Sequence, residues 1–159
     1  MKNLRSRPLA RAQRGVYAIE FSIVFLLVFT MLYAIVCYAI VFALRTGLQN
    51  AAEDGARAAL RYQLTWNDRR DEAIRVAGAQ ISLNLPVPPV VTARRCQVTD
   101  AGTSDCSTPN CGSAWTQRCQ VVVTVTARSM ASVLPPLPAF AVPETIAGEA
   151  SVLLDGDML

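Results

Sequence analysis

The feature that most constrains this chain is an uninterrupted apolar run near its N-terminus. Residues 21–44 contain no charged side chain, and as an α-helix they would extend about 36 Å, more than the roughly 30 Å of hydrocarbon in a bilayer. A buried helix of a soluble protein usually keeps a polar stripe, whereas the polar side chains of this run are few: Ser22, Thr30, Tyr33, Cys37 and Tyr38. The run therefore predicts one membrane-spanning helix.

The charge of the chain is concentrated before this run. The first residues carry five of the fifteen basic side chains and none of the twelve acidic ones, namely Lys2, Arg5, Arg7, Arg11 and Arg14. Because basic residues that flank a span tend to stay in the cytoplasm, we expect a cytoplasmic N-terminus and a C-terminal part on the opposite side. The rest of the chain is close to neutral, which argues against nucleic acid as a partner.

Two ordinary interpretations leave part of this N-terminus unexplained. The apolar run is longer than that of a cleaved secretory signal, and no small-residue cleavage site follows it. An uncleaved signal anchor would account for the length and the orientation. It would not account for Glu20, a carboxylate at the mouth of the apolar segment.

Two motifs resemble those of a pilus assembly family. Residues 14–21, RGVYAIEF, place a glutamate five residues beyond a glycine that ends a basic leader, which is similar to the prepilin peptidase site of type IV pilins and pseudopilins. Residues 48–57, LQNAAEDGAR, resemble the QNAA-x-x-GAR segment of the TadE-like branch of the tight-adherence (Tad) pilus assembly proteins.

The resemblance implies that a prepilin peptidase cuts between Gly15 and Val16 in the cytoplasm, and that Glu20 and Phe21 act in recognition and assembly. It implies as partners the inner membrane, other pilins or pseudopilins and the pilus assembly platform. The new ammonium group of Val16 would lie one helical turn from Glu20 and would offset the cost of a carboxylate near lipid, unless Glu20 is simply solvated among the headgroups. Because major Tad pilins usually carry tyrosine after this glutamate, Phe21 favours a minor pilin or pseudopilin.

The competing functional hypothesis is a signal-anchored periplasmic binding module that belongs to no fibre. An enzyme is not expected, since the chain has no histidine and shows neither a phosphate-binding loop nor a nucleophile elbow. No cofactor is expected either.

Beyond the predicted span the apolar residues keep a helical period. Ala51, Gly55 and Ala59 recur every four residues and would let another backbone approach closely. This face packs either on the chain's own C-terminal part or on another helix in an assembly, and the sequence leaves both open. Residues 65–68 then suit the start of a second helix, which we expect to end at the prolines from Pro86 onward.

After these prolines the period changes to two, which predicts strands over 90–98, 119–128 and 146–154. An apolar, proline-rich stretch at 133–143 is expected to cover one sheet edge in preference to docking a partner. The predicted fold is α+β: a long N-terminal transmembrane helix that continues into an amphipathic helix, then a small antiparallel sheet of about three strands. The expected domains are a basic prepilin-type leader (1–15), the transmembrane helix (16–45), periplasmic amphipathic helices (46–85) and a disulfide-stapled β domain (86–159).

Four of the five cysteines lie in or beside the long polar connection between the first two strands: Cys96, Cys106, Cys111 and Cys119. In an oxidising compartment they predict two disulfides. Of the three connectivities we favour Cys96 with Cys119, across neighbouring strands, and Cys106 with Cys111, within the turn. A zinc site is disfavoured because the spacings are not paired C-x-x-C motifs. Cys37 lies in the apolar run and is expected to pack there.

Overall fold

The computed structural model describes residues 14–81, 87–99, 102–129 and 143–154. The chain divides into two compact units, Met1–Ala39 and Ile40–Leu159. Nearly all of the proline-rich stretch expected to cover a sheet edge lies outside the described residues. Pro86, the first of the prolines expected to end the second helix, lies outside them as well.

Helix α1 (Arg14–Ala58) contributes to both units. In the first unit it carries the apolar run. In the second unit its side chains at Leu44, Leu48, Ala52 and Ala56 are buried in the core of the domain. The predicted spanning and amphipathic segments are therefore parts of one helix, which ends at Ala58.

Helix α2 (Trp66–Gln80) begins where the sequence predicts a helix start. The hydroxyl group of Thr65 accepts a hydrogen bond from the backbone N–H of Asp68 at 3.2 Å, so it satisfies one of the unpaired donors of the first turn. The helix ends before the prolines that were expected to end it. Ile81 leaves the helical conformation with ψ 83°, and its N–H bonds the carbonyl of Gly78.

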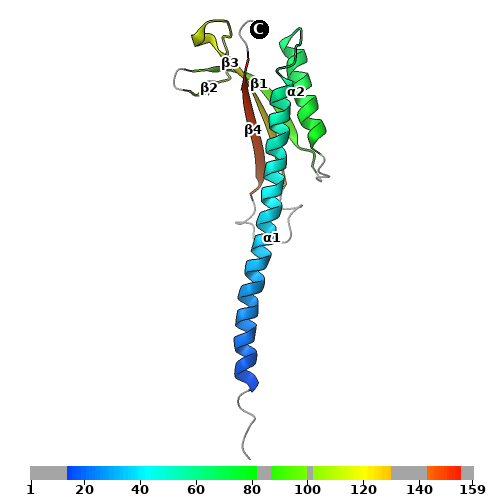
Figure 1. Ribbon diagram of the computed structural model, residues 1–159, viewed down its shortest axis with the longest axis vertical. Helices are drawn as coiled ribbons and strands as arrows, with labels where there is room; N and C mark the ends of the chain where they lie inside the picture. Colours follow the sequence, from blue (N-terminus) through cyan, green and yellow to red (C-terminus); the bar gives the residue numbers. More distant parts are fainter. Residues whose placement is uncertain (1–13, 82–86, 100–101, 130–142, 155–159) are drawn as a thin grey trace, which may run out of the picture. The chain divides into compact units, whose positions relative to one another are not determined.

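The sheet has four antiparallel strands in the order β2-β1-β3-β4 (Figure 1). Three of them are the strands predicted from the sequence, and the fourth is a two-residue strand in the long connection. Their bounds are β1 Val90–Val98, β2 Ser104–Asp105, β3 Cys119–Arg128 and β4 Thr145–Leu153.

The core of the second unit lies between one face of this sheet and the two helices. Val121, Val123 and Val125 of the central strand β3 are fully buried and belong to one cluster with alanines of α1 and α2. Small residues on the helices let the two layers approach closely, while the β-branched valines fill the space on the pleated surface. Thr124 and Thr126 alternate with these valines and lie on the opposite face.

The four clustered cysteines form two disulfides, but the favoured pairing is wrong. The observed bonds are Cys96–Cys106 and Cys111–Cys119. The register of β1 and β3 explains the difference, because Cys96 lies opposite Gln120 and Cys119 lies opposite Gln97. Residues offset by one along a strand point to opposite faces, so Cys96 and Cys119 cannot meet.

Each observed bond follows from its local geometry. Asp105 lies opposite Gln97 in the β1–β2 pair, so the next pair in the register brings Cys106 beside Cys96, with their Cα atoms 4.0 Å apart. On the other face, Cys111 packs against the core with its Cα atom 5.5 Å from that of Cys119. The two disulfides thus lie on opposite faces of the sheet.

Candidate assembly surfaces on helix α1

The apolar part of α1 has the properties of a membrane anchor. Among the described residues one helix is long and apolar enough to cross a membrane, and it is α1 from Tyr17 onward. Only 6 % of its most apolar window is buried in the protein, whereas the core helix of a soluble protein would be mostly buried. Within this part Cys37 is buried and has a free thiol. A single N-terminal apolar helix of this kind suggests a single-pass anchor.

The residues of the predicted leader site lie at the beginning of this helix. Gly15 and Val16 belong to its first turn, and the side chains of Glu20 and Phe21 are exposed. Among the described residues the carboxylate of Glu20 takes part in none of the ion pairs. The structure does not test cleavage after Gly15, which stays a prediction.

An aromatic row on the same helix was missed in the sequence. Phe21, Phe25, Phe29 and Tyr33 recur every four residues, and successive ring centroids are 6.0, 5.9 and 6.4 Å apart. Their spacing of four was the available signal, because side chains four apart share one helix face. The row gives α1 one continuous aromatic face within the first unit.

The stripe of small residues further along α1 packs within the chain. Ala51 and Ala59 are buried in the core cluster. Gly55 makes the closest approach, because a Cβ atom there would lie 2.8 Å from the Cβ of Ala77 and 2.9 Å from the carbonyl oxygen of Ala73. In this structure the stripe therefore contacts helix α2 and the sheet, the first of the two alternatives left open by the sequence.

A side chain of α1 forms two hydrogen bonds with the backbone of the edge strand β4. The amide nitrogen of Gln49 donates to the carbonyl oxygen of Glu149 at 2.9 Å, and the N–H of Glu149 donates to the Oε1 atom of Gln49 at 3.2 Å. Because β4 is the last strand of the sheet, these bonds satisfy backbone groups that no further strand pairs. The amide of Gln49 thus replaces a neighbouring strand at this position.

The contact between α1 and β4 depends on a glycine. A Cβ atom at Gly148 would lie 2.5 Å from the backbone nitrogen of Gln49 and 2.6 Å from the carbonyl oxygen of Leu48. Both are backbone atoms of a helix, so neither can move aside alone. Glycine at this position lets strand and helix backbones come close enough for the Gln49 hydrogen bonds to form.

The end of α1 is held by a buried cation. Arg69 of α2 is buried and donates from its Nη1 atom to the carbonyl oxygen of Ala59 at 2.8 Å. This carbonyl lies at the C-terminal end of α1, where unpaired carbonyl groups and the helix dipole favour a positive charge. Arg69 therefore links α2 to the end of α1.

A known protein family matches part of this same helix. Residues 15–57 match the family model described as TadE-like protein. The chain carries a TadE-like segment. The resemblance predicted from the two motifs is confirmed over these residues, and it indicates a part in Tad pilus assembly. Searches of curated proteins and of solved structures return no match.

The TadE-like segment spans both units, and the structure gives its second motif a physical role. In the run from Leu48 to Arg57, Gln49 is hydrogen-bonded to β4 and the alanines are buried in the core. Gly55 allows the close approach of α2. Arg57 is exposed and pairs with Glu53 at 3.9 Å. The motif therefore encodes the docking of the helix onto its own sheet.

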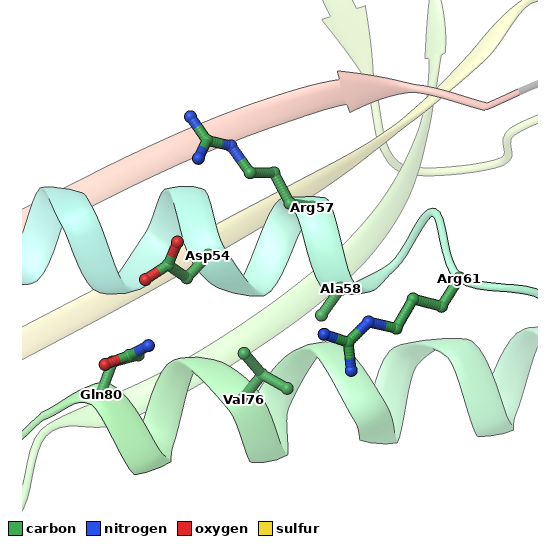
Figure 2. Close-up of a pocket in the computed structure, with 6 residues that line it drawn as sticks. All are labelled: Asp54, Arg57, Ala58, Arg61, Val76 and Gln80. Carbon is green, nitrogen blue, oxygen red and sulfur yellow. The ribbon is translucent and has the colours of Figure 1, made fainter.

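An open cavity of about 290 Å³ lies between α1 and α2, beside the end of the TadE-like segment (Figure 2). Its lining mixes charged, polar and apolar side chains: Asp54, Arg57, Ala58, Arg61, Val76 and Gln80. In Figure 2 the side chain of Arg61 extends into the space between the helices, while that of Arg57 points away from it.

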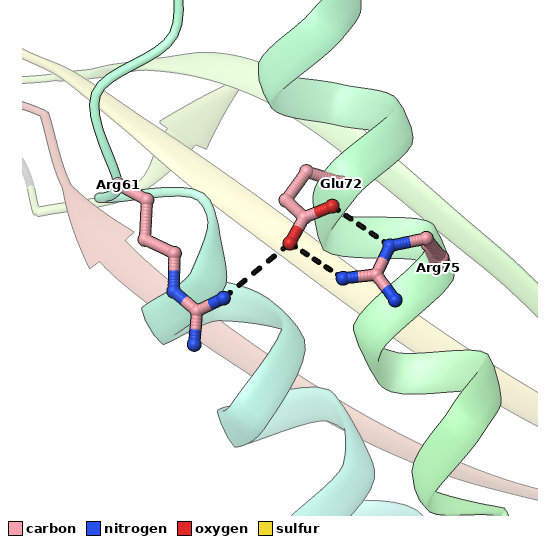
Figure 3. Close-up of polar contacts among 3 residues, drawn as sticks. All are labelled: Arg61, Glu72 and Arg75. Atoms are coloured by element: carbon pink, nitrogen blue, oxygen red, sulfur yellow. Dashed lines mark hydrogen bonds and ion pairs between the residues drawn. The ribbon is translucent and has the colours of Figure 1, made fainter.

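Next to this cavity an acidic residue of α2 contacts the connection that follows α1. The Oε1 atom of Glu72 lies 2.8 Å from Arg75 and 3.4 Å from Arg61 (Figure 3). The hydrogen bond from Arg75 holds the pKa of Glu72 below its usual range, with smaller charge effects of Arg75 and Arg61 in the same direction. The contact with Arg61 links α2 to the residues that follow α1.

Proposed function

We propose that this chain is a minor pilin or pseudopilin that takes part in the assembly of a Tad-type pilus. The observation that carries the proposal is the TadE-like match over residues 15–57, which covers both the apolar span and the part of α1 packed in the domain. Exposed apolar side chains along the span support docking through helix-to-helix contacts with other pilins in the inner membrane.

The proposal includes processing by a prepilin peptidase. Cleavage between Gly15 and Val16 removes the basic leader and leaves an ammonium group one helical turn before Glu20. Its charge offsets that of the carboxylate, either in the same chain or in a neighbouring subunit during assembly. The C-terminal domain is periplasmic in this arrangement, as the distribution of basic residues favours, and its disulfides suit that oxidising compartment.

The proposal is tested by determining the N-terminal sequence of the mature protein isolated from cells with a functional pilus system. We expect a chain that begins at Val16. A Gly15→Leu variant, which places a bulky side chain at the cleavage site, should retain its leader, whereas a Gly78→Ala control should be processed normally because a Cβ atom there meets nothing within 4 Å.

A wild-type protein that retains residues 1–15 in such cells would overturn the pilin interpretation. It would leave a signal-anchored periplasmic module that is not part of a fibre.

A further inference from the structure

Two surface sites with exposed apolar side chains lie at one end of the second unit. The turn patch consists of Leu60, Tyr62 and Leu64 in the connection between α1 and α2, with Tyr62 77 % and Leu64 83 % exposed. The loop patch consists of Trp115, 72 % exposed, and Arg118, in the connection that leads into β3. Tryptophan, tyrosine and arginine are enriched in protein–protein interfaces.

Contacts to the same end of strand β1 place the two patches near each other. The guanidinium group of Arg95 of β1 stacks over the ring of Trp66, two residues after Leu64 of the turn patch, at 5.4 Å from the ring centroid. Gln97, two residues further along β1, donates to the carbonyl oxygen of Thr116 at 2.9 Å. Both connections thus lie at the end of the sheet where β1 finishes (Figure 1), although the two patches do not cover each other.

The loop patch is held in a fixed conformation. The guanidinium carbon of Arg118 lies 3.4 Å from the ring centroid of Trp115, and its Nε atom donates to the carbonyl oxygen of Trp115 at 3.0 Å. The disulfide Cys111–Cys119 closes this loop. A surface that is already ordered loses little conformational entropy on binding, and tryptophan and arginine are the residues most enriched at energetically important contacts.

The two patches carry complementary charges. Among the described residues Arg118 makes no ion pair, and neither does Asp68, an exposed acid in the first turn of α2 four residues after Leu64. The neighbouring acids differ from Asp68, because Asp71 pairs with Arg70 and Glu72 pairs with Arg75. The exposed Arg61 inside the turn patch is paired with Glu72 at 3.4 Å, so the unpaired charge that borders this patch is the carboxylate of Asp68. The loop patch offers an apolar ring bordered by a cation.

We propose that the loop patch of one copy of this chain docks on the turn patch of a second copy. Since both patches lie at the same end of the unit, two copies standing side by side in parallel bring them to the same level. The contact joins two different surfaces, so it can be repeated from copy to copy. The contact is small and therefore weak, but anchoring both copies in one membrane raises their effective concentration and so favours it. The contact does not depend on whether the chain enters a fibre.

The test uses the full-length protein in its membrane. One copy carries a photo-reactive benzoyl-phenylalanine in place of Trp115, and a second, affinity-tagged copy is co-expressed with it. Illumination should produce an adduct of two chains whose cross-linked peptide maps to residues 60–68 of the tagged copy. The matched control places the photo-reactive residue at Ala147, which is exposed on β4 and should give no such adduct.

Charge reversal then tests the proposed ion pair between Arg118 of one copy and Asp68 of the other. Arg118→Glu in the photo-reactive copy should lower the adduct yield by up to about fivefold, the range expected for an exposed ion pair. Asp68→Arg in the tagged copy should restore it. Folding of each variant is checked by the mobility of the disulfide-bonded form before and after reduction.

An adduct at residues 60–68 that follows this pattern supports the contact. Adducts only to other parts of a second copy, adducts only to a different protein or to glycan, or no adduct at all would overturn it, as would charge reversals that leave the yield unchanged.

Discussion

Replacing Gly148 by alanine should separate strand β4 from helix α1. The new Cβ atom would lie 2.5 to 2.6 Å from three backbone atoms of Leu48 and Gln49, whereas ordinary contacts are 3.4–4 Å. To relieve this overlap, the two backbones must move apart by about 1 Å, which is a form of overpacking that costs about 1–3 kcal/mol. The Gln49 hydrogen bonds, at 2.9 and 3.2 Å, would be stretched and each would lose about 1 kcal/mol.

We therefore expect the free energy of unfolding of the Gly148→Ala variant to fall by about 3–5 kcal/mol. The assay is urea unfolding of the full-length protein in detergent micelles, followed by the fluorescence of Trp66 and Trp115. These are the two tryptophans of the chain, and both lie in the second unit.

Gly78→Ala is the matched control. A Cβ atom at this position meets nothing within 4 Å, and alanine within a helix is favoured over glycine by about 0.5–1 kcal/mol. This variant should therefore be slightly more stable than the wild type. If Gly148→Ala unfolds at the same urea concentration as the wild type, the close approach of β4 to α1 is not a feature of the folded protein.

Three other features of the molecule can be tested by substitution or reduction. Glu20→Ala should leave membrane insertion intact but impair pilus formation seen by electron microscopy, while Glu53→Ala should not; normal filaments in the Glu20 variant would refute the proposed charge pairing. Non-reducing peptide mapping should return the pairs Cys96–Cys106 and Cys111–Cys119. Each disulfide stabilises the folded state by about 2.5 kcal/mol, so reduction should make residues 99–118 accessible to protease. Identical digestion with and without reductant would contradict this. Because the pKa of Glu72 is lowered in the folded protein, its contribution to stability is complete above its ordinary value of 4.5 and is lost as the pH falls through the lower folded value. Glu72→Gln should thus show a smaller loss of stability on acidification than the wild type in urea unfolding, and parallel pH profiles would exclude this role.

Much of the fold follows from local sequence patterns. The observed bounds of β1 and β3 coincide with the predicted segments, and β4 begins one residue earlier than predicted. Alternating valines in β3 carry a strong signal, since one face of the strand is buried and the other is not. The start of α2 is equally local, because a threonine cap and the acid three residues later define it within four positions.

The features that the sequence did not reveal all depend on contacts between distant residues. The disulfide pairing is decided by the register of β1 and β3, which places Cys96 and Cys119 on opposite faces. The bond between Gln49 and Glu149 joins residues 100 positions apart. For the stripe through Gly55, the periodicity identifies the packing face but not its partner, and only the three-dimensional arrangement shows that the partner is α2.

The pairing of consecutive cysteines has a consequence for how the domain matures. Sequence separations are only 10 and 8 residues, so each loop closes at low entropic cost. In the orientation proposed above, Cys96 and Cys106 would leave the membrane before Cys111 and Cys119. An oxidant that joins each cysteine to the next one to emerge would then produce the native bonds directly, without later rearrangement by an isomerase.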